Sequence, residues 1–203
     1  MLLSTFVFAY LLGLPYGILL FNKSEQGLAP EPSLYKVLSF LTNTLRSIPF
    51  LILMVLLIPV TRAISGTSIG PLAAVVPLTI ATAPFIARMV ESALREVPLG
   101  IVEAAKSMGA DDHNILFKVL ISEARPALIS GSILAAVNIL TYSALAGFIG
   151  SGGLGAIAIN YGYNRYNFEV MAWTVLVIVL LVQIIEAIGK LALSKFDHSK
   201  TNN

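Results

Sequence analysis

Three adjacent residues, Asp111, Asp112 and His113, are of the types that carry out general acid–base catalysis, and they are the first candidates for chemistry in this sequence. Catalytic carboxylates require a fixed and partly desolvated pocket. Three consecutive residues at the start of a helix point in different directions, and an aspartate there is better explained as the cap of that helix. We therefore expect no catalytic residue in this chain. An intramembrane enzyme built on these three side chains is the alternative.

Metal and nucleotide chemistry is also disfavoured. The sequence has no cysteine, and its two histidines, His113 and His198, are far apart, so we expect no metal site. The segment Gly150–Gly155 fits the G-x-G-x-x-G pattern of dinucleotide sites, but it follows an apolar run and lacks the βαβ unit that such a site needs. No G-x-x-x-x-G-K-[ST] phosphate-binding loop occurs. We expect no cofactor here, and any ATP with its magnesium must be bound by another polypeptide.

Two charged residues lie inside apolar runs, where ionisable groups are functional candidates by default. Arg46 is long enough to extend toward the nearer membrane surface. Glu186 has Lys190 four residues later, a favourable spacing for an ion pair on a helix. We favour a structural role for Arg46 and Glu186. We also expect Glu91 and Arg95, four residues apart, to form a simple pair on a helix surface.

The elements that must position these residues are membrane helices. Hydrophobic residues make up 57% of the 203 and charged residues only 12%, about half of what a soluble domain carries. A helix needs roughly 20 apolar residues to cross the hydrocarbon of a bilayer. We expect a single all-α transmembrane domain, residues 1–203, with about five spans. The predicted spans are Leu2–Phe21, Val37–Val60, Gly70–Met89, Ala127–Phe148 and Val170–Leu193, with kinks expected at Pro49, Pro59, Pro77 and Pro84.

The distribution of basic residues predicts the orientation of the spans, because Lys and Arg gather in cytoplasmic loops. Most of the 13 lie in the first loop, in the loop of residues 92–125 with its edges, and in the tail that holds Lys195 and Lys200. Only Arg62 and Arg165 lie in loops on the other side. We expect the N-terminus outside and the C-terminus in the cytoplasm. The net charge of +2 then reflects topology, and we expect membrane lipid rather than nucleic acid as a partner.

The loop of residues 92–125 carries too many charges to lie in lipid, and its pattern predicts a helix–turn–helix. Helix-favouring residues run from Ile101 to Met108, and Gly109 stands where a helix commonly ends in the left-handed conformation. A second helix follows, capped by one of the two aspartates, and its apolar residues recur at helical spacing. This shape, on the cytoplasmic side, suits docking better than catalysis.

The string Glu103-Ala104-Ala105, followed after three residues by Gly109, resembles the EAA loop of permeases in binding-protein-dependent ABC importers. Ile121-Ser122 stand where the family has Leu-Pro, which predicts a less sharply enforced bend after the second helix. The resemblance implies a type I ABC importer permease fold, in which this loop is a coupling helix that docks on cytoplasmic P-loop ATPase subunits. Glu103 and Gly109 would fix the turn. The residues implied to make contact are Ala104, Ala105, Lys106, Ser107 and Met108.

Further strings resemble the methionine-type permeases in particular. They are Asn43–Phe50, Gly66–Gly70, Ala83–Glu91 and the glycine-rich Gly152–Gly155 with the following Tyr161-Gly162-Tyr163. This resemblance implies a bacterial inner-membrane protein that works as a homodimer and receives its substrate from a separate extracytoplasmic binding protein, often a lipoprotein. The implied substrate is methionine, as the D or L form or both.

Mildly polar residues inside the spans are candidates for the path of a substrate. Residues three or four apart share a helix face, as in the third and fourth spans. A commoner role for such residues is hydrogen bonding between helices or to their own backbone. The candidates are Thr42, Asn43, Thr79, Thr82, Asn138, Thr141 and Tyr142.

Two other classes of transporter are alternatives to a methionine permease. One is an ABC permease of the same architecture for another amino acid. The other is a secondary carrier that works without partners, which is disfavoured because no charged ion-coupling site stands in mid-membrane. Dependence on a partner separates these classes: a carrier or an enzyme should work alone, whereas an ABC permease should be inert without its ATPase.

Overall fold

The computed structural model of the chain describes residues 1–194, apart from the side chain of Ile149, so Lys195, His198 and Lys200 lie outside the described residues. Residues 1–194 form helices and loops without a strand. The elements in chain order are α1 (Leu2–Lys23), α2 (Pro32–Ser47), α3 (Phe50–Leu56), α4 (Ile58–Ser65), α5 (Pro71–Arg95), α6 (Leu99–Ser107), α7 (Asp112–Asn114), the π-helical η1 (Ile115–Leu120), α8 (Ile121–Glu123), α9 (Arg125–Ala146), the 3-10 helix η2 (Gly147–Ile149), α10 (Gly153–Ile157), the π-helical η3 (Ala158–Tyr163) and α11 (Phe168–Ser194).

Four helices are long and apolar enough to cross a membrane: α1, α5, α9 and α11. They correspond to the first, third, fourth and fifth predicted spans, which confirms the all-α membrane fold. A fifth crossing is possible only if the bent pair α2 and α3 is counted as one span.

The second predicted span, residues 37–60, is not a continuous helix, because the chain turns by 102° between α2 and α3. The cause is Pro49, where a kink was expected. Proline disfavours the helical conformation of the residue before it, and Ile48 is accordingly extended, with φ −81° and ψ 123°. By contrast, Pro77 and Pro84 lie inside the uninterrupted helix α5.

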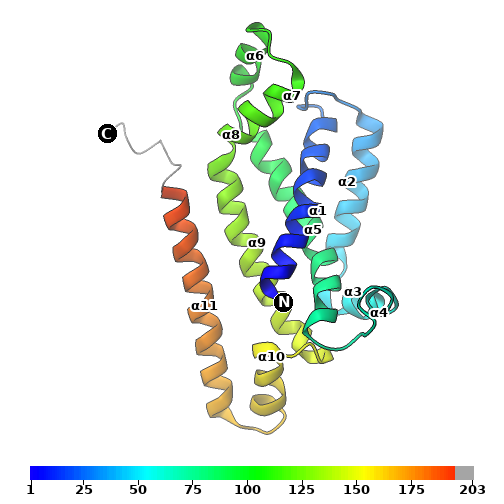
Figure 1. Cartoon of the computed structure of the whole chain (residues 1–203), viewed down its shortest axis with the longest axis vertical. Coiled ribbons are helices and arrows are strands. Elements are labelled where there is room, and N and C mark those ends of the chain that lie inside the picture. Colours follow the sequence, from blue (N-terminus) through cyan, green and yellow to red (C-terminus); the bar gives the residue numbers. More distant parts are fainter. Residues whose placement is uncertain (195–203) are drawn as a thin grey trace.

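Helix α5 is the centre of the bundle. In its most apolar stretch 61% of the residues are buried, against 6% in α11, which stands at the edge of the bundle (Figure 1). Helix α1 packs most extensively on α5, and two glycines permit this approach. A Cβ atom on Gly13 would lie 2.8 Å from the carbonyl oxygen of Ala83, and one on Gly17 would lie 2.5 Å from that of Ala87. Side chains at these two positions would therefore force the helices apart.

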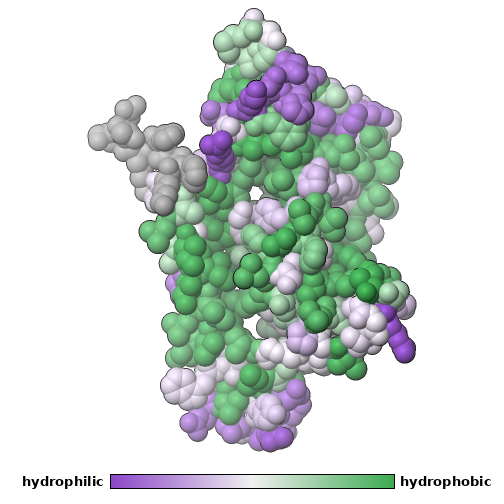
Figure 2. All heavy atoms as spheres, in the orientation of Figure 1, coloured by the Kyte–Doolittle hydropathy of each residue, from purple (hydrophilic) through white to green (hydrophobic). Residues whose placement is uncertain are grey.

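The short helices α6, α7 and α8 form the loop between α5 and α9 and stand together at one end of the molecule (Figure 1). Hydrophilic residues gather at this end and at the opposite end beyond α10, with a mostly hydrophobic band between them (Figure 2). One buried cluster joins α5 to the loop through Leu94, Ala105, Ile115 and Leu120. The loop is therefore packed onto the end of α5 and shares its core.

Candidate functional site

Helix α6 ends in a Schellman motif, in which a glycine in the left-handed conformation closes the last turn. Gly109 has φ +81°, and its N–H donates to the carbonyl of Lys106 at 2.9 Å. The N–H of Ala110 donates to the carbonyl of Ala105 at 3.1 Å, and the two alanines belong to the same apolar cluster. The predicted end of the first loop helix at Gly109 is confirmed.

The second helical segment of the loop begins at Asp111, as the sequence predicted for one of the two aspartates. A carboxylate oxygen of Asp111 accepts from the backbone N–H of Asn114 at 3.3 Å and from the side-chain amide of the same residue. The side-chain hydrogen bond from Asn114 lowers the pKa of Asp111 below its ordinary value. Asp111 therefore acts as a helix cap, and the described residues contain no group of three or more His, Asp or Glu that could hold a metal ion.

The seven predicted coupling residues fall into two environments. Ala105 is 4% exposed and faces η1, so its side chain belongs to the core of this chain, and burial contradicts the predicted contact of Ala105 with another protein. The exposed residues are Glu103, Ala104, Lys106, Ser107, Met108 and Gly109. Met108 is 81% exposed, so the end of α6 presents a large apolar side chain.

Glu103 was expected to fix the turn together with Gly109, and the structure gives that role to Gly109 alone. The Glu103 side chain makes no hydrogen bond or ion pair with any residue among 1–194, and only its backbone carbonyl is engaged, by the hydroxyl of Ser107 at 2.9 Å. Its carboxylate is thus free to meet a donor on another molecule. The exposed end of α6 consequently presents an anion, a cation and a large apolar side chain within two turns of helix.

The carboxylate of Glu91 is the centre of a polar network beneath the loop. Its side chain is only 4% exposed, and its oxygens pair with Arg88 at 2.6 Å and with Arg95 at 2.7 Å. The Tyr35 hydroxyl donates to Glu91 at 2.9 Å, and Arg88 donates to the side chain of Asn43 at 3.0 Å. The expectation of a simple surface pair between Glu91 and Arg95 was wrong, because α2 covers this face of α5.

The predicted path residues do not converge on one cavity. Thr42 is buried and donates to the carbonyl of Leu38 at 2.8 Å, and Asn43 accepts from Arg88. Thr79 and Thr82 are buried in α5, with hydroxyls that find no hydrogen-bond partner within residues 1–194. Thr42, Thr79 and Thr82 face the interior of the chain, so a path along them would require the helices to separate, whereas Asn43 is exposed.

The three candidates on α9 also have separate environments. Thr141 is exposed and donates to the carbonyl of Val137 at 3.1 Å. Tyr142 stacks on Phe50 of α3, with ring centroids 4.6 Å apart. Asn138 is half-buried. Bonding of a threonine to its own backbone is thus confirmed for Thr42 and Thr141, and none of the seven lines the small cavity or the larger cleft of this chain.

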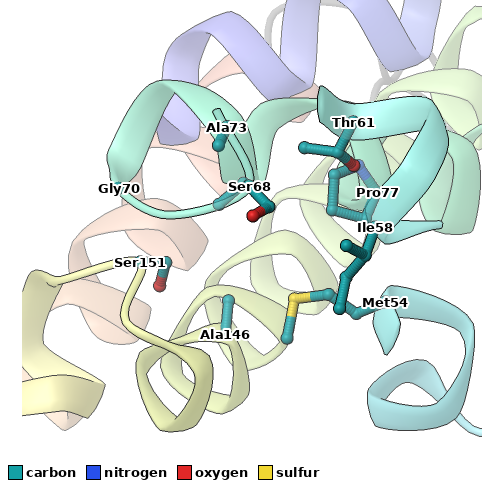
Figure 3. A pocket seen from close by; sticks show the side chains of 10 residues that line it. Met54, Ile58, Thr61, Ser68, Gly70, Ala73, Pro77, Ala146 and Ser151 are labelled. Carbon is teal, nitrogen blue, oxygen red and sulfur yellow. The ribbon is translucent and has the colours of Figure 1, made fainter. Parts of the chain in front are cut away.

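The small cavity lies at the end of the molecule opposite to the loop, among α3, α4 and the start of α5 (Figure 3). Its volume is about 20 Å³, enough for one water molecule. The Thr61 side chain lies at this cavity, and its buried hydroxyl has no partner within the described chain. Met54 and Ala146 belong to the same wall. The cavity is too small to hold an amino acid, and we regard it as a packing feature.

The larger cleft, of about 460 Å³, lies between α2, α5 and α9. This size is within the range of small-molecule sites. Arg46 comes from α2 and the rest of the wall from α5, from the residues just after it and from α9. The lining residues include Arg46, Phe85, Arg88, Met89, Ser92, Gly131 and Leu134.

The fold is a helical membrane bundle with an exposed helix–turn–helix at one end. This combination is typical of the permeases of transport systems. The chain belongs to the family of binding-protein-dependent transport system inner membrane components, which it matches over residues 6–199. It is accordingly a bacterial inner-membrane, multi-pass permease subunit of an ABC importer and not an enzyme. This membership removes the secondary carrier and the intramembrane enzyme from the alternatives.

Relatives and solved structures agree with this membership. The chain is 48% identical over 189 residues to the probable D-methionine transport system permease protein MetI of Vibrio cholerae, with 93% of this chain and 84% of the relative covered. It is 47% identical over 179 residues to the methionine import system permease protein MetP of Bacillus subtilis, covering 88% and 81%. The MetNI methionine ABC transporter, solved in inward-facing conformations, superposes with a TM-score of 0.95 at 43% identity, covering 98% and 92%.

An amino acid ABC transporter solved with histidines shares the fold alone, with a TM-score of 0.66 at 21% identity.

Sequence reasoning missed two features of the site. It gave Glu91 no partner on α2, although the spacing of Arg88, Glu91 and Arg95 places both arginines on the same helix face as the carboxylate. It also treated Arg46 as a side chain that reaches for the membrane surface, whereas Arg46 lines the cleft. The sequence did hold a signal for Arg46, because a cation inside an apolar run is costly and is therefore a functional candidate.

Proposed function

We propose that this chain carries methionine across the inner membrane as one of two identical permease subunits, each formed by residues 1–203 as a single domain. Cytoplasmic P-loop ATPases bind the ATP and magnesium, and an extracytoplasmic binding protein delivers the substrate. The relatives named for methionine or D-methionine transport, at close to half identity over most of the chain, support this substrate.

The observation that carries the proposal is the geometry of the loop 92–125. The exposed face of α6 projects from the end of the bundle, while Ala105 and the η1 residues fasten the same helix to α5. A displacement of the exposed face of α6 would therefore be transmitted to α5, because the two helices share one packed core. This is the property that a coupling helix requires, since ATP-driven closure of the ATPases must move the spans.

The transport cycle follows from two arrangements of the same helices. ATP binding draws the two ATPases together, the α6 helices move with them, and the bundle changes from an arrangement open to the cytoplasm to one open to the binding protein. The chain forms no covalent bond with its substrate. Its part is to present a path and to close that path at one end at a time.

An importer for another amino acid is the second candidate, because the binding protein supplies much of the specificity in such systems. An amino acid ABC transporter with histidines has the same fold, so the fold by itself does not select methionine. The methionine candidate is preferred because the relatives at 47–48% identity carry methionine in their names.

Uptake by the reconstituted transporter tests the proposal. The permease, its ATPase and its binding protein are placed in liposomes with ATP inside, and uptake of radiolabelled L-methionine, D-methionine, histidine and glutamine is measured. We expect methionine uptake that requires all three proteins and ATP. Uptake of only another amino acid would replace methionine as the substrate. Uptake by the permease alone would overturn the dependence on an ATPase.

A further inference from the structure

Arg46 is a cation at the cleft that its own chain leaves unengaged. The guanidinium lies over the ring of Phe85, 6.0 Å from its centroid, and makes no hydrogen bond or ion pair with another residue in the described part of the chain. Arg88, at the same cleft, differs in this respect. It pairs with Glu91 at 2.6 Å and donates to Asn43 at 3.0 Å. Arg46 is therefore the cation of this cleft that has no anionic partner among the described residues, and the hydroxyls of Ser92 and Ser130 stand in the same wall.

The depth of Arg46 makes an unengaged cation costly. Helix α5 has 25 residues and is about 37 Å long at 1.5 Å per residue. Phe85 lies ten residues before the last residue of α5, about 15 Å from that end, and four residues before the end of the predicted span at Met89, so Arg46 stands inside the span but nearer to its loop end than to its middle. A charge inside a membrane span is costly unless water or a counter-charge accompanies it. Its place in the last turn of α2 is favoured by the helix dipole, yet the dipole engages none of its five N–H donors.

Part of the wall around Arg46 is apolar, and Arg88, Ser92, Glu96 and Ser130 supply the polar remainder. Phe85 and Met89 lie one turn apart on α5, and Leu134 faces them from α9. Gly131 contributes no side chain. A Cβ atom added to Gly131 would lie 2.8 Å from the terminal methyl carbon of Met89. A molecule that fits this cleft has an anionic group at one end, for the arginine, and an apolar body.

We propose that the cleft is a substrate site of the permease, in which the Arg46 guanidinium binds the carboxylate of an amino acid whose apolar side chain lies against Phe85, Met89 and Leu134. This inference rests on the proposed function and extends it to named residues. The planar fork of arginine matches a carboxylate with two parallel hydrogen bonds. One such pair in an open cleft gives weak binding, which suits a site that must release its substrate at every cycle.

The test uses the absence of cysteine from the sequence. Ser92 is exposed at the cleft, and in Ser92→Cys it becomes the one thiol of the permease. The complex with its ATPase is treated with a water-soluble maleimide, and labelling of the permease band is followed with time. Methionine is compared with methioninamide, which has the same side chain and no carboxylate. A thiol at Thr67, which is exposed near the opposite end of α5, is the matched control.

We expect methionine to slow labelling at position 92 several-fold and methioninamide to leave it nearly unchanged, with no effect of either at position 67. Arg46→Gln, combined with Ser92→Cys, should raise the methionine concentration for half-protection roughly tenfold, and Arg46→Lys should restore part of it. Equal protection by methionine and methioninamide, or full protection in Arg46→Gln, would overturn the role of Arg46.

The two proposals fail in distinguishable ways. If the complex imports methionine but methionine never protects position 92, the site is wrong and the function stands. If protection depends on Arg46 but uptake of methionine fails in the complete reconstituted system, the carboxylate site stands and methionine is wrong as the transported substrate.

Discussion

The hydroxyl of Tyr35 on α2 donates a 2.9 Å hydrogen bond to the buried carboxylate of Glu91 on α5. The two residues are 56 positions apart, and the same carboxylate forms ion pairs with both Arg88 and Arg95. This contact ties the bent helix α2 to the helix that carries the loop. A displacement of α5 by the loop would therefore move α2, and with it Arg46.

Removal of the Glu91 charge should destabilise the chain strongly. In Glu91→Gln two arginines lose a counter-charge that is only 4% exposed, while they themselves keep some access to water, and we expect a loss of about 2 kcal/mol in the free energy of unfolding. Titration of mixed detergent micelles with a denaturing detergent measures this quantity. The control is Glu186→Gln, which breaks the exposed pair with Lys190 and should cost less than about 1 kcal/mol. Equal losses in both variants would contradict the central role of Glu91.

Contact between α1 and α5 should not tolerate a methyl group on Gly17. A Cβ there would lie 2.5 Å from the Ala87 carbonyl oxygen, so Gly17→Ala must separate the helices, and we expect a loss of about 1–3 kcal/mol. A Cβ on Gly100 in α6 would have no other atom within 4 Å, and Gly100→Ala should gain about 0.5 kcal/mol from helix propensity. The same micelle titration measures both, and stabilisation of Gly17→Ala would refute the packing argument.

The Asp111 cap should make the start of α7 sensitive to acid. The hydrogen bond from Asn114 lowers the pKa of Asp111 in the folded loop, so its contribution is present above the ordinary pKa and is lost as the pH falls through the lowered value. Hydrogen exchange of a peptide covering residues 112–120, corrected for intrinsic rates, should show protection that declines in this acid range.

The variant Asp111→Asn provides the control for the acid sensitivity. Asparagine also caps helices but does not titrate, so protection should persist and its decline with acid should vanish. Asp112→Asn removes a neighbouring carboxylate that is not the cap and should keep the decline. An unchanged decline in Asp111→Asn would assign the acid sensitivity to another group.

The end of α6 should control attachment of the ATPase. Gly109 has φ +81°, and a β-branched residue is strained there, so Gly109→Val should distort the exposed face and sharply reduce the amount of ATPase that copurifies with the permease. Gly66, with φ +73° at the end of α4, provides a variant of equal strain at the opposite end of the molecule, and Gly66→Val should keep the ATPase. Loss of the ATPase in both variants would indicate general misfolding.

Features that depend on a short stretch of sequence were predictable. Runs of about 20 apolar residues identified four helices. The helix–turn–helix of the loop 92–125 was recognised because Gly109 and Asp111 end and begin helices by their own backbone and side-chain chemistry. The break after α2 was also indicated by Pro49. The sharp turn at this break was not predicted, since a proline fixes where a helix ends and leaves open the direction in which the chain continues.

Features that depend on the meeting of distant helices were not predictable from one sequence. The sequence predicted Glu91 to be a surface residue, but α2 covers it. The polar residues of the spans were predicted to line a path, but they lie in separate environments. Arg46 shows the reason most clearly. The amino-acid sequence by itself determined that a cation stands within an apolar run. Only the tertiary structure decided that this cation borders a cleft, because the rotation of α2, α5 and α9 about their axes sets which faces meet.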